Sequence, residues 1–133
     1  MEALRFEPPV ANASPAHLLE DAKVGGYNLK KGDNIIVNIH ALHHNSAEWQ
    51  MPNKFLPERF DSNHPLFLTP QGKKRSTGSY IPFNGGKRVC FGKTFAEANM
   101  KIVATYLTQF FDMDYREKDK YPDTHSLPMA HIG

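Results

Sequence analysis

The chain has 133 residues, enough for one domain or for part of a larger one. Its 16 Lys and Arg residues against 14 Asp and Glu give a formal net charge of +2, which is too small to indicate a nucleic-acid-binding surface. The single cysteine excludes an internal disulfide and a four-cysteine zinc site, and no apolar run approaches the roughly 20 residues that span a bilayer. A metal site with one thiolate ligand stays open.

The first seven residues predict a short helix, because Glu2-Ala3-Leu4-Arg5 are good helix formers and Pro8-Pro9 ends the run. Glu2 and Arg5 are three positions apart and therefore share one face of that helix. From spacing alone, this pattern indicates an exposed ion pair worth about a few tenths of a kcal/mol.

Residues 25–40 predict a β-hairpin. Residues 25–29 form its first arm, Gly32 supplies the turn, and residues 34–40 form a second arm in which alternate positions are Ile or Val.

Residues 42–50 predict a short helix followed by Pro52. Three histidines, His40, His43 and His44, suggest a zinc site at first sight. No Cys, Asp or Glu joins them at ligand spacing, so we expect ordinary side chains instead.

Two segments follow that carry charge in different ways. In residues 55–60, two aromatic residues flank Glu58 and Arg59. This pattern indicates either that the two charged side chains are buried or that the segment is an ordinary exposed turn. Residues 61–79 predict a long loop with a basic tip at Lys73-Lys74-Arg75, and loops of this length tend to be functional or to wrap another segment.

Residues 93–111 give the clearest helix prediction in the chain. Apolar residues recur there at steps of four and three, which places one continuous stripe along the helix: Ala96, Met100, Val103, Leu107 and Phe110. After Asp114 the sequence becomes polar and shows no closing element.

Three interpretations compete for the glycine-rich segment that contains Cys90. A phosphate-binding loop is excluded by counting, because five residues separate Gly86 from Gly92 where that motif has four. A buried, inert cysteine is the commonest role for a lone thiol. The third interpretation is a thiolate ligand to haem iron.

Haem ligation explains the neighbouring residue types. The N-terminus of the following helix would favour the thiolate of Cys90. Gly86 and Gly92 allow a flat ring to approach the backbone. Arg88 can pair with a carboxylate at the ring edge, and Phe83 can shield the sulfur from water.

Three ordered motifs resemble those of the cytochrome P450 family. Phe83-x-x-Gly86-x-Arg88-x-Cys90-x-Gly92 matches the family's cysteine signature, Glu2-Ala3-Leu4-Arg5 resembles its E-x-x-R motif, and Pro57-Glu58-Arg59-Phe60 resembles its P-E-R-F segment. The resemblance covers nearly the whole chain. It implies that Glu2, Arg5 and Arg59 form a buried charged triad, which replaces the exposed ion pair expected from spacing.

The resemblance also implies the fold. We expect a mainly α structure with a small β-hairpin component, corresponding to the C-terminal part of the P450 fold and incomplete at both ends, with residues 1–133 as one truncated domain. The central helix that handles oxygen, most of the substrate pocket and any membrane anchor would be missing. Residues 10–17 lack the arginine that many members use on a haem propionate.

The implied function is that of a haem-thiolate monooxygenase with haem b, whose axial iron ligand is Cys90. The parent enzyme would use two electrons from a reductase or ferredoxin to insert one oxygen atom of O₂ into a small organic substrate. The compartment stays open: the endoplasmic reticulum membrane for a eukaryotic microsomal-type parent, the cytoplasm for a bacterial-type one. The electron donor would meet a basic proximal face formed by Lys73, Lys74, Arg75, Lys87 and Lys93.

The alternative is a non-catalytic fragment or split-gene remnant that binds haem weakly or not at all.

Overall fold

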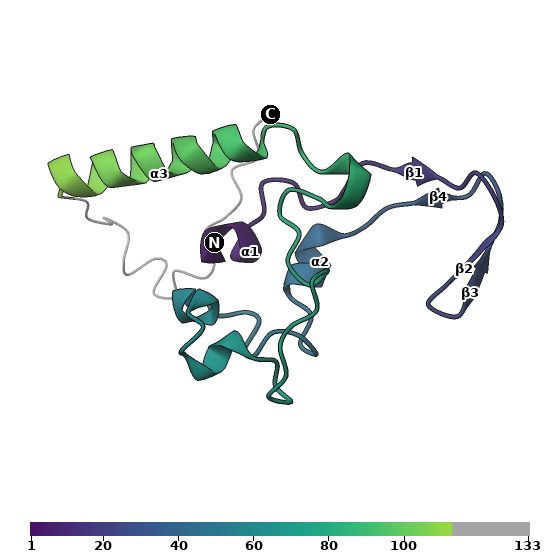
Figure 1. The fold of residues 1–133 in the computed structure, drawn as a ribbon, viewed down its shortest axis with the longest axis horizontal. Coiled ribbons are helices and arrows are strands. Elements are labelled where there is room, and N and C mark those ends of the chain that lie inside the picture. Colours follow the sequence, from purple (N-terminus) through teal and green to yellow (C-terminus); the bar gives the residue numbers. More distant parts are fainter. Residues whose placement is uncertain (113–133) are drawn as a thin grey trace, which may run out of the picture. The chain divides into compact units, whose positions relative to one another are not determined.

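The structure is a computed structural model that describes residues 1–112 and falls into two compact units, Met1–Asn84 and the segment from Gly85 onward. In the first unit, short helices are joined by irregular segments (Figure 1). Proline occupies the first turn of both 3₁₀ helices, where its missing N–H has no helical partner in any case. These elements are α1 (Glu2–Phe6), α2 (Ile39–His43), η1 (Pro57–Phe60) and η2 (Pro65–Phe67).

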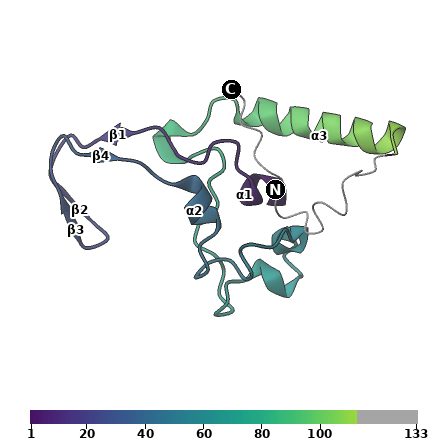
Figure 2. The same ribbon diagram turned by 180° about the vertical axis from the view of Figure 1, so that it is seen from behind.

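Four strands of the first unit form two antiparallel pairs. β2 (Ala22–Val24) pairs with β3 (Tyr27–Leu29), and β1 (Ala16–His17) pairs with β4 (Asn34–Ile35). The two pairs follow one another along one extended arm, which Figure 2 shows from behind.

The predicted hairpin of residues 25–40 is wrong in its pairing. The hairpin that the structure contains turns at Gly25-Gly26, where φ is +57° and +89°. Two consecutive residues with positive φ form a two-residue hairpin turn whose twist matches that of the strands. Residues 27–29 therefore pair with the preceding residues 22–24 and not with residues 34–40. The segment around Gly32 connects β3 to β4, and β4 pairs with residues 16–17 instead.

The predicted helix of residues 42–50 is also displaced. The helix spans Ile39–His43, and its N-cap is Asn38, whose side chain accepts a hydrogen bond from the Ala41 N–H at 2.7 Å. This cap ends the strand pattern that was expected to run to residue 40. Trp49 then lies in a bend outside the helix, and its backbone N–H donates to the Asn45 carbonyl at 2.9 Å.

The interior of the first unit is unusually polar. Among the described residues, the buried apolar side chains are Phe6, Ala13, Ile39 and Trp49. The buried polar or charged ones are more numerous: Glu2, Arg5, His43, Arg59, Thr69 and Ser79. Buried charges must find ionic and hydrogen-bond partners, so this unit is organised by polar contacts.

The second unit contains η3 (Gly86–Arg88) and α3 (Lys93–Phe110). The helix predicted over residues 93–111 is therefore confirmed to within one residue. Most of its apolar stripe is exposed: Met100, Val103, Leu107 and Phe110. Neither this helix nor any other in residues 1–112 is long and apolar enough to cross a membrane. The polar segment after Asp114 lies outside the described residues.

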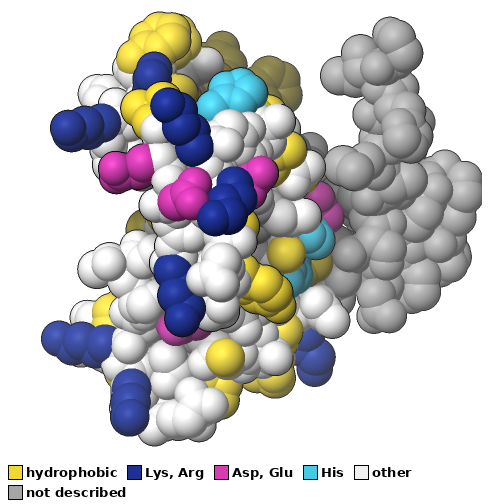
Figure 3. Space-filling view, turned by 90° about the vertical axis from the view of Figure 1, so that its right-hand side faces the viewer, with side chains coloured by type: hydrophobic (Ala, Val, Ile, Leu, Met, Phe, Trp, Pro, Cys, Tyr) yellow, Lys and Arg dark blue, Asp and Glu magenta, His cyan; other side chains and the backbone are white. Residues whose placement is uncertain are grey.

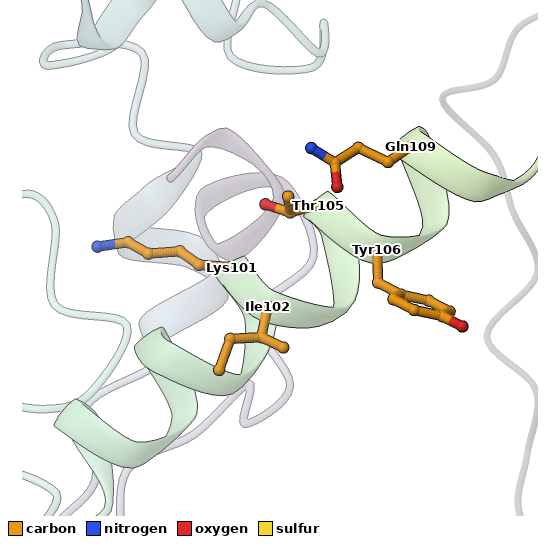
Figure 4. Close-up of a pocket in the computed structure, with 5 residues that line it drawn as sticks. All are labelled: Lys101, Ile102, Thr105, Tyr106 and Gln109. Atoms are coloured by element: carbon orange, nitrogen blue, oxygen red, sulfur yellow. The ribbon is translucent and has the colours of Figure 1, made fainter.

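Five side chains of α3 line an open hollow: Lys101, Ile102, Thr105, Tyr106 and Gln109. In Figure 4 the three polar side chains follow one another along the same side of the helix, whereas Tyr106 points to the opposite side. Ligand pockets are concave and bury most of their ligand, which side chains from one helix alone do not achieve. This hollow therefore lacks the shape of a ligand site.

Met51 has a strained backbone, with φ at +45° in a non-glycine residue. Its carbonyl is held there by the guanidinium of Arg59 at 2.6 Å, while its side chain is 48% exposed. Asn tolerates this left-handed region better than Met.

We expect Met51→Asn to raise the free energy of unfolding of the purified protein by about 0.5–1 kcal/mol in denaturant titrations, because it relieves this strain. Met51→Ala keeps the strain and serves as the control. Equal stability of the Asn and Ala variants would contradict the strain assigned to this position.

Candidate functional site

The carboxylate of Glu2 binds two arginines in the interior of the first unit. Arg5 donates to it twice, from Nε and from Nη2, each at 2.8 Å. Arg59 donates from Nε at 3.2 Å. The Leu56 N–H adds a fourth bond at 3.0 Å. Glu2 is 3% exposed and both arginines are 0% exposed, so the exposed ion pair expected from spacing alone is wrong.

Two guanidinium groups face one carboxylate, so one positive charge remains unbalanced inside the unit. Backbone carbonyls surround this charge. Arg5 donates to the carbonyls of His43, Pro52 and Lys54, and Arg59 to those of Gln50, Met51 and Lys54. Burial and the neighbouring Arg5 charge lower the pKa of Arg59, but an arginine stays protonated in a protein.

Arg75 belongs to this interior and not to an exposed basic tip, which corrects the sequence-based expectation. Its Nη2 donates to the Arg59 carbonyl at 2.7 Å and its Nη1 to the Leu66 carbonyl at 3.0 Å. Its guanidinium carbon lies 4.3 Å from the centroid of the buried Trp49 ring. Burial, and then the charge of Arg59, lower the pKa of Arg75. Lys73 and Lys74 beside it are exposed.

The segment that leads to the cysteine loop, residues 80–84, ends the first unit. We call it the stem. His43 binds it, since its Nε2 accepts a hydrogen bond from the Ile81 N–H at 2.9 Å. Phe83 is half-buried here. At Asn84, φ is +64° and the N–H donates to the Ile81 carbonyl at 2.9 Å. The sequence pattern marked His43 as ordinary, because its partner lies 38 positions away.

The cysteine loop opens the second unit. Gly86 has φ at +61°, which favours glycine, and it begins the 3₁₀ turn that carries Lys87 and Arg88, both exposed. The Cys90 thiol is exposed. The backbone carbonyl of Cys90 accepts a hydrogen bond from the Lys93 N–H at 3.2 Å. Gly92 is the N-cap of α3, and a Cβ there would stand 3.8 Å from the sulfur.

Cys90 lies close in sequence to the positive end of a helix. The residue stands three positions before the start of an 18-residue helix whose N-terminus has no side-chain cap. Backbone N–H groups without helical partners and the helix dipole give that end of a helix a partial positive charge.

The donor set around Cys90 suits a metal that brings its other ligands. Nowhere in residues 1–112 do three His, Cys, Asp or Glu side chains gather into a metal site, and this includes the three histidines around α2. A porphyrin supplies four nitrogen ligands, so a haem iron needs only one side chain from the protein, such as that of a cysteine. The residues present therefore fit haem better than a protein-bound ion.

Cationic side chains do not gather into one patch on the face drawn in Figure 3. The face drawn in Figure 3 shows Lys and Arg side chains set among acidic and neutral ones. Lys87 and Lys93 are exposed in the second unit, as are Lys73 and Lys74 in the first.

Removal of one member of the triad Glu2, Arg5 and Arg59 tests how much these buried charges stabilise the fold. We expect Arg59→Ala or Glu2→Gln to lower the free energy of unfolding by about 3–5 kcal/mol, because each leaves a buried charge without its partner. Denaturant unfolding followed by circular dichroism measures this loss.

The matched control is Glu58→Ala, which removes an exposed charge from the same 3₁₀ helix and should cost no more than about 0.5 kcal/mol. A similar loss in all three variants would refute the special role of the triad.

Comparison with known proteins places this geometry in a family. The sequence model described as Cytochrome P450 matches residues 1–132. Steroid 17-alpha-hydroxylase/17,20 lyase of Cavia porcellus is 33% identical over 129 residues, which cover 96% of this chain and 24% of that protein. The enzyme of the same name from Homo sapiens gives the same identity and coverage. The chain thus spans about a quarter of the length of these curated relatives.

Solved structures of cytochromes P450 are also similar to this chain. Cyanobacterial CYP120A1 with bound retinoic acid superposes with a TM-score of 0.71 at 34% identity, over 81% of this chain and 24% of that one. A zebrafish cytochrome P450 with abiraterone gives a TM-score of 0.65 at 29% identity, over 81% and 23%. The chain belongs to the cytochrome P450 family.

Proposed function

We propose that this chain forms the thiolate side of the haem site in a monooxygenase, with Cys90 as the axial iron ligand. The observation that carries the proposal is the exposed thiol of Cys90 at the uncapped N-terminus of α3. Proteins of the P450 family bind haem b. The chain would correspond to the C-terminal part of the family's fold and act within a longer polypeptide, since it matches about a quarter of its relatives' length.

Five residues of the stem and the cysteine loop have roles in this proposal. Bound haem supplies the oxygen chemistry, which an axial thiolate assists by donating electron density. Cys90 would supply the sulfur ligand, and Arg88 would pair with a propionate of the ring. Gly86 and Gly92 would keep side-chain atoms away from the ring face. Phe83, in the stem before the loop, would limit access of water to the sulfur.

Glu2, Arg5 and Arg59 have a structural role in this proposal. They fix the irregular segments of the first unit, and the unit carries the stem that leads into the cysteine loop. Arg75 extends the same network through the Arg59 carbonyl.

The substrate and electron donor follow from the family. Relatives include steroid hydroxylases, and one similar structure contains progesterone. We therefore propose a small, mainly apolar organic substrate that receives one atom of O₂, while the other atom leaves as water. Two electrons would come from an acidic reductase or ferredoxin, which the exposed Lys87 and Lys93 near the cysteine loop would attract.

The CO spectrum of the reduced haem protein tests the ligand. The full reading frame that encodes this chain is expressed, reduced with dithionite and exposed to CO. We expect the red-shifted Soret band of a thiolate-ligated haem, and we expect Cys90→Ser to abolish it. Asn99→Ser, a polar substitution on the exposed face of α3, is the control and should leave the band unchanged.

The alternative function predicts a different result. A band that survives Cys90→Ser would remove Cys90 from the site. Absence of haem from both the full reading frame and the 133-residue chain would support the non-catalytic remnant.

A further inference from the structure

His43 is a buried histidine whose hydrogen bond defines its protonation state. Its side chain is 0% exposed, and its Nε2 accepts a hydrogen bond from the Ile81 N–H at 2.9 Å. A ring nitrogen that accepts carries no proton, so the imidazole is neutral and its proton is on Nδ1. Nδ1 is itself buried, and no described residue makes a hydrogen bond of good geometry with it.

The groups around the His43 ring come from three segments. Arg5 on α1 donates to the His43 carbonyl at 2.9 Å, His44 follows it at the end of α2, and the Tyr80 ring of the stem stacks on the imidazole at 5.3 Å. Burial above all, together with the charges of Arg5 and His44, lowers the pKa of His43 to about 4. The carbonyls of Leu4 and Arg5 oppose this shift.

The bond from His43 attaches the stem to the helical part of the first unit. Ile81 is followed by Pro82, which has no N–H to donate. Ile81 also accepts the Asn84 N–H, so it anchors the turn at which the stem ends. Cys90 lies nine residues after Ile81 along the chain.

We propose that His43 is a positioning residue for Cys90: its neutral Nε2 fixes Ile81 and thereby the stem from which the thiolate loop departs. This inference rests on the function proposed above, and it goes further by assigning a role to a side chain outside the three family motifs. A protonated Nε2 would face the Ile81 N–H as a second donor, so acidification breaks the attachment.

The sign of the pH effect follows from the pKa. The folded protein holds the pKa of His43 below its ordinary value of 6.5, so the unfolded state binds more protons between these two values. The contribution of His43 to stability is therefore complete above pH 6.5 and is lost as the pH falls towards about 4.

Two substitutions separate acceptance of the hydrogen bond from packing. His43→Phe keeps a ring against Tyr80 but offers no acceptor. His43→Gln offers a neutral amide oxygen that cannot titrate. His40→Phe is the control, since this neighbouring histidine is exposed on the same helix. All are made in the full reading frame as the haem-loaded protein.

Hydrogen exchange of the peptide covering residues 80–90 reads the attachment directly. At pH 7.5 we expect exchange about two- to tenfold faster in His43→Phe, because one hydrogen bond is lost, and near the wild-type rate in His43→Gln and His40→Phe. In the wild type, exchange corrected for its intrinsic pH dependence should accelerate between pH 6.5 and pH 4, whereas His43→Gln should lack this acceleration.

The CO spectrum measures whether loss of the His43 hydrogen bond changes the fraction of thiolate-ligated haem. The red-shifted fraction should fall in His43→Phe at pH 7.5 and reversibly in the wild type on acidification. Equal impairment of the Phe and Gln variants, or wild-type exchange without an acid acceleration, would overturn the role of His43. If Cys90→Ser leaves the red-shifted band, the proposed function fails while the exchange data still decide the attachment by His43.

Discussion

The carboxylate of Glu2 is the group on which the rest of the first unit depends. It binds two buried guanidinium groups that bring more positive charge than it can balance. The remaining charge is distributed over backbone carbonyls at the end of α2 and in residues 50–54. Because a guanidinium donates in fixed directions, those carbonyls must lie where the two arginines point. The path of the irregular backbone follows from that geometry.

This arrangement explains how a unit with few buried apolar residues keeps a defined structure. Buried ion pairs contribute little net stability compared with apolar packing, yet loss of one partner is costly. Their effect here is specificity: turns and 3₁₀ helices, which have few internal hydrogen bonds, are held in one register by Arg5, Arg59 and Arg75. Trp49 completes the interior, with Arg5 and Arg75 each close to its ring, at 5.3 Å and 4.3 Å.

Sequence reasoning succeeded where the signal is local. Helix α3 follows from its apolar period, and α1 from four helix formers before a Pro-Pro pair. The role of the glycine-rich loop that contains Cys90 stays a prediction, which rests on residue order. Two failures have local causes. The Gly25-Gly26 turn, not the one at Gly32, sets the strand pairing, and the Asn38 cap sets the start of α2. The third failure has a long-range cause. Arg75 resembled its lysine neighbours because its partners, Arg59 and Leu66, are brought close only by folding.

The buried charges also act on the stem through electrostatics. Arg5 is bound to Glu2 on one side and to the His43 carbonyl on the other, so its positive charge lies next to the imidazole. Burial is the main effect that disfavours protonation of His43, and the nearby cation acts in the same direction. Only the neutral ring can accept the Ile81 N–H. The triad therefore does two things at once: it fixes the backbone at the end of α2, and it adds to the burial that keeps His43 in the neutral state that binds the stem.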